Sequence, residues 1–146
     1  IRIISPWLSA ERTLMHTYLA SLEEGARQLE RLPEKPRKVL VLDFANPFSA
    51  GLDLVPPRGG SAWLHWGRNI DAAHFIPPER MFADVEVLMV PKWGINNLPL
   101  RDLYKSYIEA TFEPMLESDG WITHRRRQNE IASRFGPPRE HESLAR

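Results

Sequence analysis

The chain has 146 residues, of which 42% are hydrophobic and 26% are charged, and 19 basic residues balance 19 acidic ones. A chain of this length forms one domain that buries roughly 68–70% of its unfolded surface. The hydrophobic share excludes disorder, and no apolar run approaches the roughly 20 residues that span a bilayer. The balanced charge argues against a nucleic-acid partner, and the lack of cysteine excludes disulfides and thiolate chemistry.

The first predicted element is a long helix over residues 6–32. Apolar residues recur there at intervals of three and four, as Leu14, Tyr18 and Leu22 illustrate, and this spacing is typical of an amphipathic helix. Pro33 follows the last apolar position. Because proline cannot continue a helix, we expect the helix to end there.

Two short apolar runs, residues 38–44 and 85–90, are bounded by turn residues and show no alternation. Such runs predict strands that are buried on both faces, as in a parallel sheet. Residues 100–112 have the clearest helical pattern; Pro114 is expected to end or kink that helix, and residues 121–125 alternate like an edge strand. We therefore expect an α/β domain with a small, at least partly parallel sheet of roughly three to five strands, flanked by helices.

Residues 45–83 interrupt this pattern with five of the 13 prolines and four of the eight glycines. A loop of this length within a domain is usually functional or disordered. Its many apolar side chains favour an ordered excursion that packs its own aromatic residues. We expect residues 1–136 to form the domain and residues 137–146 to be a disordered tail. Because the chain begins with Ile1 rather than Met, we also expect it to be part of a longer protein.

Polar residues follow both predicted parallel strands, at the sheet edge where ligands bind in open α/β folds. Asp43 and Asn46 can bind a ribose hydroxyl, a metal or a substrate amine there, or they can simply cap the turn. Lys92 is expected at the same edge, where it either pairs with Asp43 or forms an ordinary ion pair. Dinucleotide, phosphate-loop and G-x-S-x-G motifs are absent, so we assign no catalytic residue and expect no metal and no cofactor.

The long loop carries the remaining ligand-binding candidates. Arg58 precedes two glycines, a pattern that can form an anion site or only a turn. The others place polar groups beside tryptophans, which is typical of a sugar or lipid-headgroup surface, or of a small hydrophobic core beneath a loop: Trp63, His65, Trp66, Arg68 and His74. Outside the loop, Arg125-Arg126-Arg127 is the one cationic run, and it is either a solvated rim or a contact for anionic lipid.

Four segments between residues 20 and 127 carry a resemblance to known proteins: EEGARQLERLP, RKVLVLDFANPFSAGLDLVPPRGG, FADVEVLMVPKW and LYKSYIEATFEPMLESDGWITHRRR. The matching features are a strand ending near Asp43, the VEVLMVPK strand, the helix over 100–112 and a closing W-x-x-x-R-R strand. The chain thereby resembles the soluble C-terminal domain of multi-spanning bacterial glycosyltransferases of the GT-C, arabinose-transferase-like class, or of membrane proteins built like them.

The resemblance implies a parent protein that transfers a sugar from a polyprenyl-phosphate donor to a lipid or glycan acceptor. This chain would be its non-catalytic accessory domain in the periplasm or elsewhere outside the cytoplasm. The aromatic loop would contact glycan or a lipid-linked sugar, and an upstream part would hold the domain at the membrane. The membrane-proximal catalytic carboxylate of that class maps onto no residue here, because these residues contain no transmembrane span.

Two other interpretations stay open. The first is a free-standing, cytoplasmic α/β enzyme or ligand-binding protein with a pocket at the strand ends; its candidate side chains would cluster in one concave site. The second is a protein interaction module that dimerises through an edge strand or through its exposed tryptophans.

Overall fold

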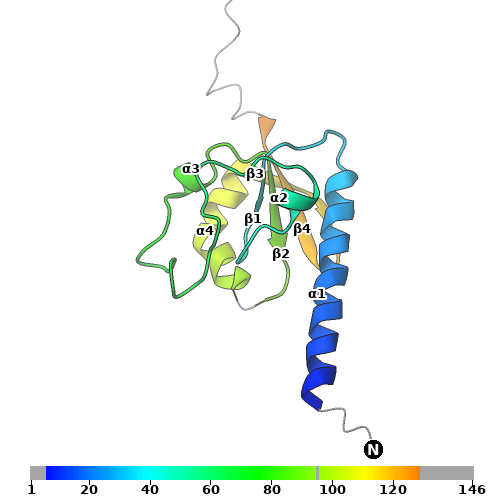
Figure 1. Cartoon of the computed structure of the whole chain (residues 1–146). Helices are drawn as coiled ribbons and strands as arrows, with labels where there is room; N and C mark the ends of the chain where they lie inside the picture. Colours follow the sequence, from blue (N-terminus) through cyan, green and yellow to red (C-terminus); the bar gives the residue numbers. More distant parts are fainter. Residues whose placement is uncertain (1–5, 95, 129–146) are drawn as a thin grey trace, which may run out of the picture.

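The computed structural model describes residues 6–94 and 96–128, which form a four-stranded mixed sheet with helices on both faces (Figure 1). The strands lie in the order β1-β2-β4-β3 and comprise β1 (Val39–Val41), β2 (Val87–Pro91), β3 (Phe112–Glu117) and β4 (Trp121–Arg126). β1 and β2 are parallel, whereas β4 is antiparallel to both β2 and β3. This arrangement confirms the predicted α/β class. The expected tail, residues 137–146, lies outside the described residues.

Two long helices enclose the sheet, α1 (Pro6–Glu30) on one face and α4 (Asn97–Thr111) on the other. Two short helices, α2 (Phe48–Gly51) and α3 (Pro78–Met81), lie within the long connection between β1 and β2. No helix among the described residues combines the length and the apolar character needed to cross a membrane.

β1 and β2 are buried along their whole length, as the sequence predicts for strands covered on both faces. Their side chains alternate between two cores. Leu40 and Leu88 pack with Tyr104 of α4, whereas Val39 and Met89 pack on the opposite face with α1. The two parallel strands therefore have no exposed face on which to carry polar functional groups, and such groups can lie only at their ends.

β3 is a strand that the sequence interpretation missed. The chain becomes extended at Phe112, directly after α4, and Pro114 lies inside β3 instead of ending or kinking the helix. β3 is an edge strand with a register irregularity between Pro114 and Leu116. A proline is tolerated there because the missing N–H faces away from the neighbouring strand.

The two outer edges of the sheet are both protected. At β1, the Val39 carbonyl accepts a hydrogen bond of 2.8 Å from Asn46 Nδ2, and the Arg37 carbonyl accepts one of 2.9 Å from the Val55 amide. β3 carries Glu113 and Pro114 at the other edge. Covered backbone groups, charge and proline all oppose edge-to-edge pairing, so the sheet edges are poor dimerisation surfaces.

The long connection between β1 and β2 contributes side chains to the hydrophobic cores on both faces of the sheet. Its Leu64, Ile70 and Met81 are buried with α4, and its Phe48 and Leu54 are buried with α1. Residues 61–66 form no strand; an isolated bridge joins Trp66 to Ile70. The connection is thus fixed by contacts with the sheet, which also fixes the polar and aromatic residues between these anchors.

The approach of α1 to the sheet yields a stability prediction. A methyl group at Gly25 would lie 2.5 Å from Phe48 Cζ and 3.1 Å from Trp121 Nε1. We therefore expect Gly25→Ala to lower the free energy of unfolding by about 1–3 kcal/mol, although alanine favours helix. Gly51→Ala is the control, because nothing lies within 4 Å of its added methyl. Urea unfolding followed by circular dichroism measures both; equal stability of the two variants would contradict this packing.

Candidate functional site

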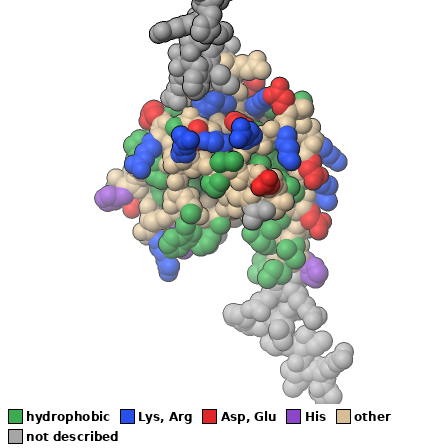
Figure 2. Space-filling model, turned by 45° about the horizontal axis from the view of Figure 1, so that its top comes forward, with side chains coloured by type: hydrophobic (Ala, Val, Ile, Leu, Met, Phe, Trp, Pro, Cys, Tyr) green, Lys and Arg blue, Asp and Glu red, His purple; other side chains and the backbone are tan. Residues whose placement is uncertain are grey.

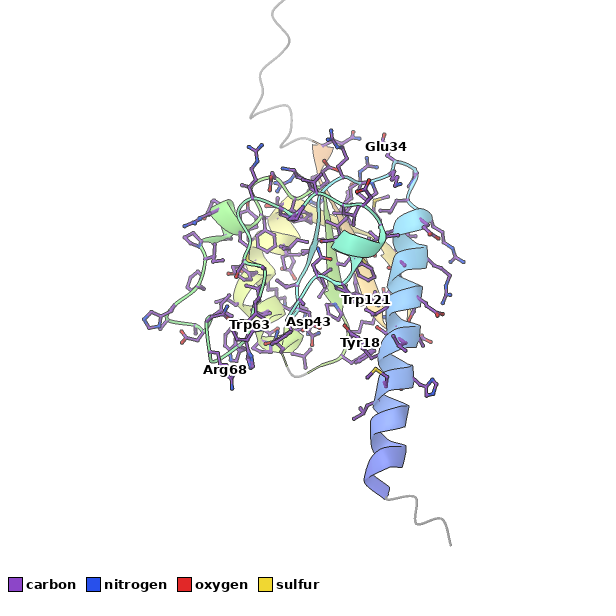
Figure 3. All side chains as sticks on the ribbon, in the orientation of Figure 1. Tyr18, Glu34, Asp43, Trp63, Arg68 and Trp121 are labelled. Atoms are coloured by element: carbon purple, nitrogen blue, oxygen red, sulfur yellow. The ribbon has the colours of Figure 1, made fainter. Side chains whose placement is uncertain are left out.

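A cavity of about 310 Å³ opens at the carboxyl ends of β1 and β2. Its walls are largely apolar and include four aromatic side chains: Phe44 follows β1, Trp93 follows β2, Trp121 begins β4, and Tyr18 reaches in from α1. Asp43 is the only charged side chain among the described residues that line it. Figure 3 shows Asp43, Tyr18 and Trp121 from these separate elements near one end of the sheet. The sequence predicts polar ligand-binding residues at the strand ends. The structure has there an apolar cavity, in part aromatic, with one carboxylate, that of Asp43.

Asp43 is held by hydrogen bonds that leave it partly exposed. Its Oδ1 accepts from the Phe44 amide at 2.7 Å and from Asn96 Nδ2 at 3.3 Å. Asn96 also donates from Nδ2 to the Leu64 carbonyl at 2.8 Å and accepts from the Trp66 amide at 2.7 Å. This one asparagine therefore joins the ends of β1 and β2 to the long loop, and so positions both the carboxylate and the loop's aromatic residues.

Three rings of the loop and strand end form a second group beside the cavity. Phe44, Trp63 and His65 meet edge to face, with ring centroids 5.3–5.5 Å apart. Phe44 also lines the cavity, so this cluster extends the aromatic surface outward toward the loop tip that carries Arg68 (Figure 3). Trp66, in contrast, is partly buried against the α4 core. The predicted aromatic surface therefore contains Trp63 and His65, with Arg68 at its margin.

Three other candidates act within the fold, away from Asp43. Asn46 caps the turn after β1, because its Oδ1 accepts from the Phe48 amide at 3.1 Å while its amide nitrogen holds Val39. His74 is exposed and contacts Asp71 of its own turn at 3.4 Å. Lys92 pairs with Glu117 at 2.6 Å, and this hydrogen bond holds the pKa of the Glu117 carboxyl below its ordinary value. The ordinary ion pair, and not the pair with Asp43, is therefore the one observed.

Arg58 lies at the opposite end of the sheet from Asp43. Its amide donates to Asp84 Oδ1 at 3.1 Å, and Asp84 forms an ion pair with Lys38, which precedes β1. A methyl group at Gly59 would fall 1.5 Å from the Arg80 carbonyl oxygen. Gly59 is thus needed for the close approach of two backbone segments, which favours the turn interpretation over an anion site.

The Arg125-Arg126-Arg127 run is also engaged within the fold. Arg125 pairs with Glu34, and Arg127 lies 3.7 Å from Glu113. Arg126 donates from Nε to the Val85 carbonyl at 2.8 Å, and its guanidinium stacks 4.9 Å from the centroid of the Phe112 ring. These arginines hold strand ends together through contacts with carboxylates and backbone carbonyls, while Arg127 stays exposed at the rim.

Sequence reasoning missed four residues of the site: Tyr18, Trp93, Asn96 and Trp121. Trp93 and Asn96 could have been found by the rule that identified Lys92, since they follow the same buried strand. Tyr18 and Trp121 gave no such signal. Both looked like ordinary apolar positions of an amphipathic helix and an alternating strand, and only the packing of α1 against β4 brings them to the cavity.

A smaller hollow of about 250 Å³ lies between α4 and β4 and contains His124. Burial lowers the pKa of the His124 imidazole below its ordinary value of 6.5. Its charged neighbours on α4 belong to pairs along the helix, such as Lys105 with Glu109 at 3.9 Å. The hollow holds a neutral histidine near pH 7 and brings no acid–base partner to it among the described residues.

Comparisons of the chain with protein-family models, with curated proteins and with solved structures found no significant match. The function of the strand-end cavity is therefore argued from its own residues.

The bridging asparagine yields a prediction about stability. Asn96→Ala removes partners of the Leu64 carbonyl and the Trp66 amide, and we expect a loss of about 1–3 kcal/mol in the free energy of unfolding. Asn69 is the control, because it makes similar bonds to Trp63 and His65 but is exposed. Water can replace the amide there, so Asn69→Ala should cost less. An equal or larger loss for Asn69→Ala in chemical denaturation would contradict the assigned role of Asn96.

His124 yields a prediction about pH. The folded state binds a proton on the His124 imidazole more weakly than the unfolded state does. The neutral imidazole therefore contributes fully to the free energy of unfolding above about pH 6.5, and this contribution is lost as the pH falls toward the pKa of the folded state. We expect His124→Gln to flatten the fall in unfolding free energy just below pH 6.5. Urea unfolding at successive pH values measures it, and an unaltered slope in His124→Gln would contradict the assignment.

Proposed function

We propose that this chain is the accessory, non-catalytic domain of a membrane-bound, polyprenyl-phosphate-sugar-dependent glycosyltransferase-like protein, located outside the cytoplasm. Its role is to hold the saccharide part of a glycan or lipid-linked acceptor in the cavity at the carboxyl ends of β1 and β2. The observation that carries this proposal is the composition of the cavity: apolar walls, in part aromatic, with a single carboxylate.

Those side chains suit a saccharide ligand for chemical reasons. Sugars have apolar faces of C–H groups that pack on aromatic rings, and Trp93 offers such a ring with 43% of its surface exposed. Their hydroxyl groups donate hydrogen bonds, and Asp43 keeps carboxylate oxygen free to accept them. A concave site with apolar walls and few polar groups is the usual form of a small-ligand pocket.

The distribution of the polar candidates supports binding over catalysis. Glycoside chemistry uses two carboxylates that flank the reacting bond, and Asp43 is alone at the cavity among the described residues. The hydrogen-bond partners of Asp43 are an amide nitrogen and an asparagine, neither of which transfers protons. Arg58 and His74 lie elsewhere, and Lys92 is committed to Glu117. A strand-end enzyme would need these groups together.

Titration with trisaccharides tests the proposal. We expect mannotriose, arabinotriose or chitotriose at millimolar concentrations to shift the indole N–H NMR signal of Trp93. Trp93→Ala should weaken that binding at least about tenfold, because a tryptophan at the centre of a contact carries much of its energy. Phe75→Ala is the matched control, since Phe75 is a similarly exposed aromatic residue, at 45% against 43%, but does not line the cavity.

Three outcomes would overturn the proposal. One is the absence of any shift at the cavity with all three sugars, and another is an equal effect of Trp93→Ala and Phe75→Ala. The third is hydrolysis or transfer of the sugar that Asp43→Asn abolishes, because it would make the chain an enzyme in its own right.

A further inference from the structure

The two ends of the sheet differ sharply in chemistry. Four of the eleven large hydrophobic side chains that the described residues expose lie near the carboxyl ends of β1 and β2: Phe44, Trp63, Trp93 and Leu98. The amino end carries ion pairs instead, such as Lys38 with Asp84 and Arg125 with Glu34. Figure 2 shows this separation, with charged side chains gathered across the upper part of the molecule and hydrophobic ones below.

The first half of α1 adds to the apolar end. Figure 1 shows α1 projecting well past the sheet, and residues 14–20 are all exposed. Four of them are large and apolar: Leu14 at 70%, Met15 at 59%, and Tyr18 and Leu19 at 49% each. At 3.6 residues per turn, these four side chains span an arc of about 140° on the helix. This arc overlaps the face on which Gly25 and Leu29 pack against the sheet.

The width and composition of this surface differ from those of a coiled-coil seam. A coiled-coil seam with a second copy uses a narrow stripe of two positions in seven, whereas four of the seven residues 14–20 are large and apolar here. Tyrosine and tryptophan combine an apolar ring with a polar edge, and they concentrate where hydrocarbon meets water in membranes. The apolar surface also continues from α1 across the strand ends, in contrast to a groove made for one peptide.

Arg68 supplies a second, independent feature. It is exposed on the loop tip at the apolar end (Figure 3) and forms no ion pair within residues 6–94 and 96–128. A guanidinium at the margin of an aromatic surface suits a lipid phosphate, because it donates two parallel hydrogen bonds to phosphate oxygens.

From these features we infer that the carboxyl end of the domain docks on a lipid bilayer. Residues 14–20 of α1 and the aromatic residues at the strand ends enter the interface, and Arg68 binds lipid phosphate. The cavity then opens at the level of the headgroups, and its ligand is the saccharide of a lipid-linked sugar instead of a free glycan. This inference rests on the proposed function for the identity of that ligand, but not for the docking itself.

Vesicle flotation of the whole chain tests the docking. We expect the chain to float with neutral phosphatidylcholine vesicles, and Leu14→Gln/Leu19→Gln to weaken binding at least about tenfold. Glutamine keeps the helix propensity close to that of leucine. The matched control is Val55→Gln/Met115→Gln, which removes two apolar side chains exposed elsewhere, at 45% and 36%. That control should bind within about twofold of the unaltered chain, as expected for residues outside the interface.

Arg68→Gln tests the phosphate contact. On vesicles that also contain phosphatidylglycerol, we expect this change to weaken binding about three- to fivefold at low salt, and less at high salt. Binding of the unaltered chain to neutral vesicles should persist in high salt, because the apolar contact is not screened.

Several results would overturn the inference. One is the absence of flotation with either vesicle, and another is binding that requires phosphatidylglycerol and vanishes in salt. A third is equal loss in the Leu14/Leu19 variant and its control. A fourth is a stable dimer in sedimentation that Leu14→Gln/Leu19→Gln dissociates, since a second copy would then cover α1. Failed flotation with an intact trisaccharide response overturns the docking alone, and the reverse pair of results overturns the proposed function alone.

Discussion

The burial of β1 and β2 on both faces is the constraint on which the rest of the molecule depends. Alternate residues of these strands, such as Leu88 and Met89, pack against α4 and α1 respectively, so neither face can carry a ligand site. Chemistry is thereby confined to the two ends of the parallel pair. The two ends differ in their side chains: the amino end carries ion pairs, and the carboxyl end carries aromatic residues.

The amino end shows why the equal numbers of acidic and basic residues do not make the surface uniform. Burial alone raises the pKa of the Asp84 carboxyl, but hydrogen bonds from the Lys38 ammonium and the Arg58 amide outweigh it and hold the pKa below its ordinary value. The carboxylate thus stays charged and joins the segments that lead into β1 and β2. Arg126 also donates a hydrogen bond to the Val85 carbonyl at this end of the sheet. The arginine run therefore stabilises the fold. The carboxyl end retains few charges, which suits it to an apolar partner.

Much of this fold could be predicted from the sequence, because hydrophobic periodicity reports burial directly. The continuous apolar runs identified β1 and β2, and the rule that ligands bind at strand ends pointed to Asp43. β3 could not be predicted because a proline such as Pro114 usually indicates the end of a helix. It is tolerated in this edge strand because of the register between β3 and β4, which the sequence does not reveal. Lys92 pairs with Glu117, and Tyr18 lines the cavity, because segments that are distant in the sequence pack together. No local sequence pattern predicts such packing.

Hydrogen–deuterium exchange of the chain with and without vesicles that contain a polyprenyl phosphate tests the central claim, that the carboxyl end is the functional end. We expect slower amide exchange in residues 14–22, 43–46 and 93–98 when vesicles are present. Exchange at the amino end, in residues 34–38 and 84–86, should not change. Protection confined to the amino end, or the same small change in both groups of residues, would contradict the account.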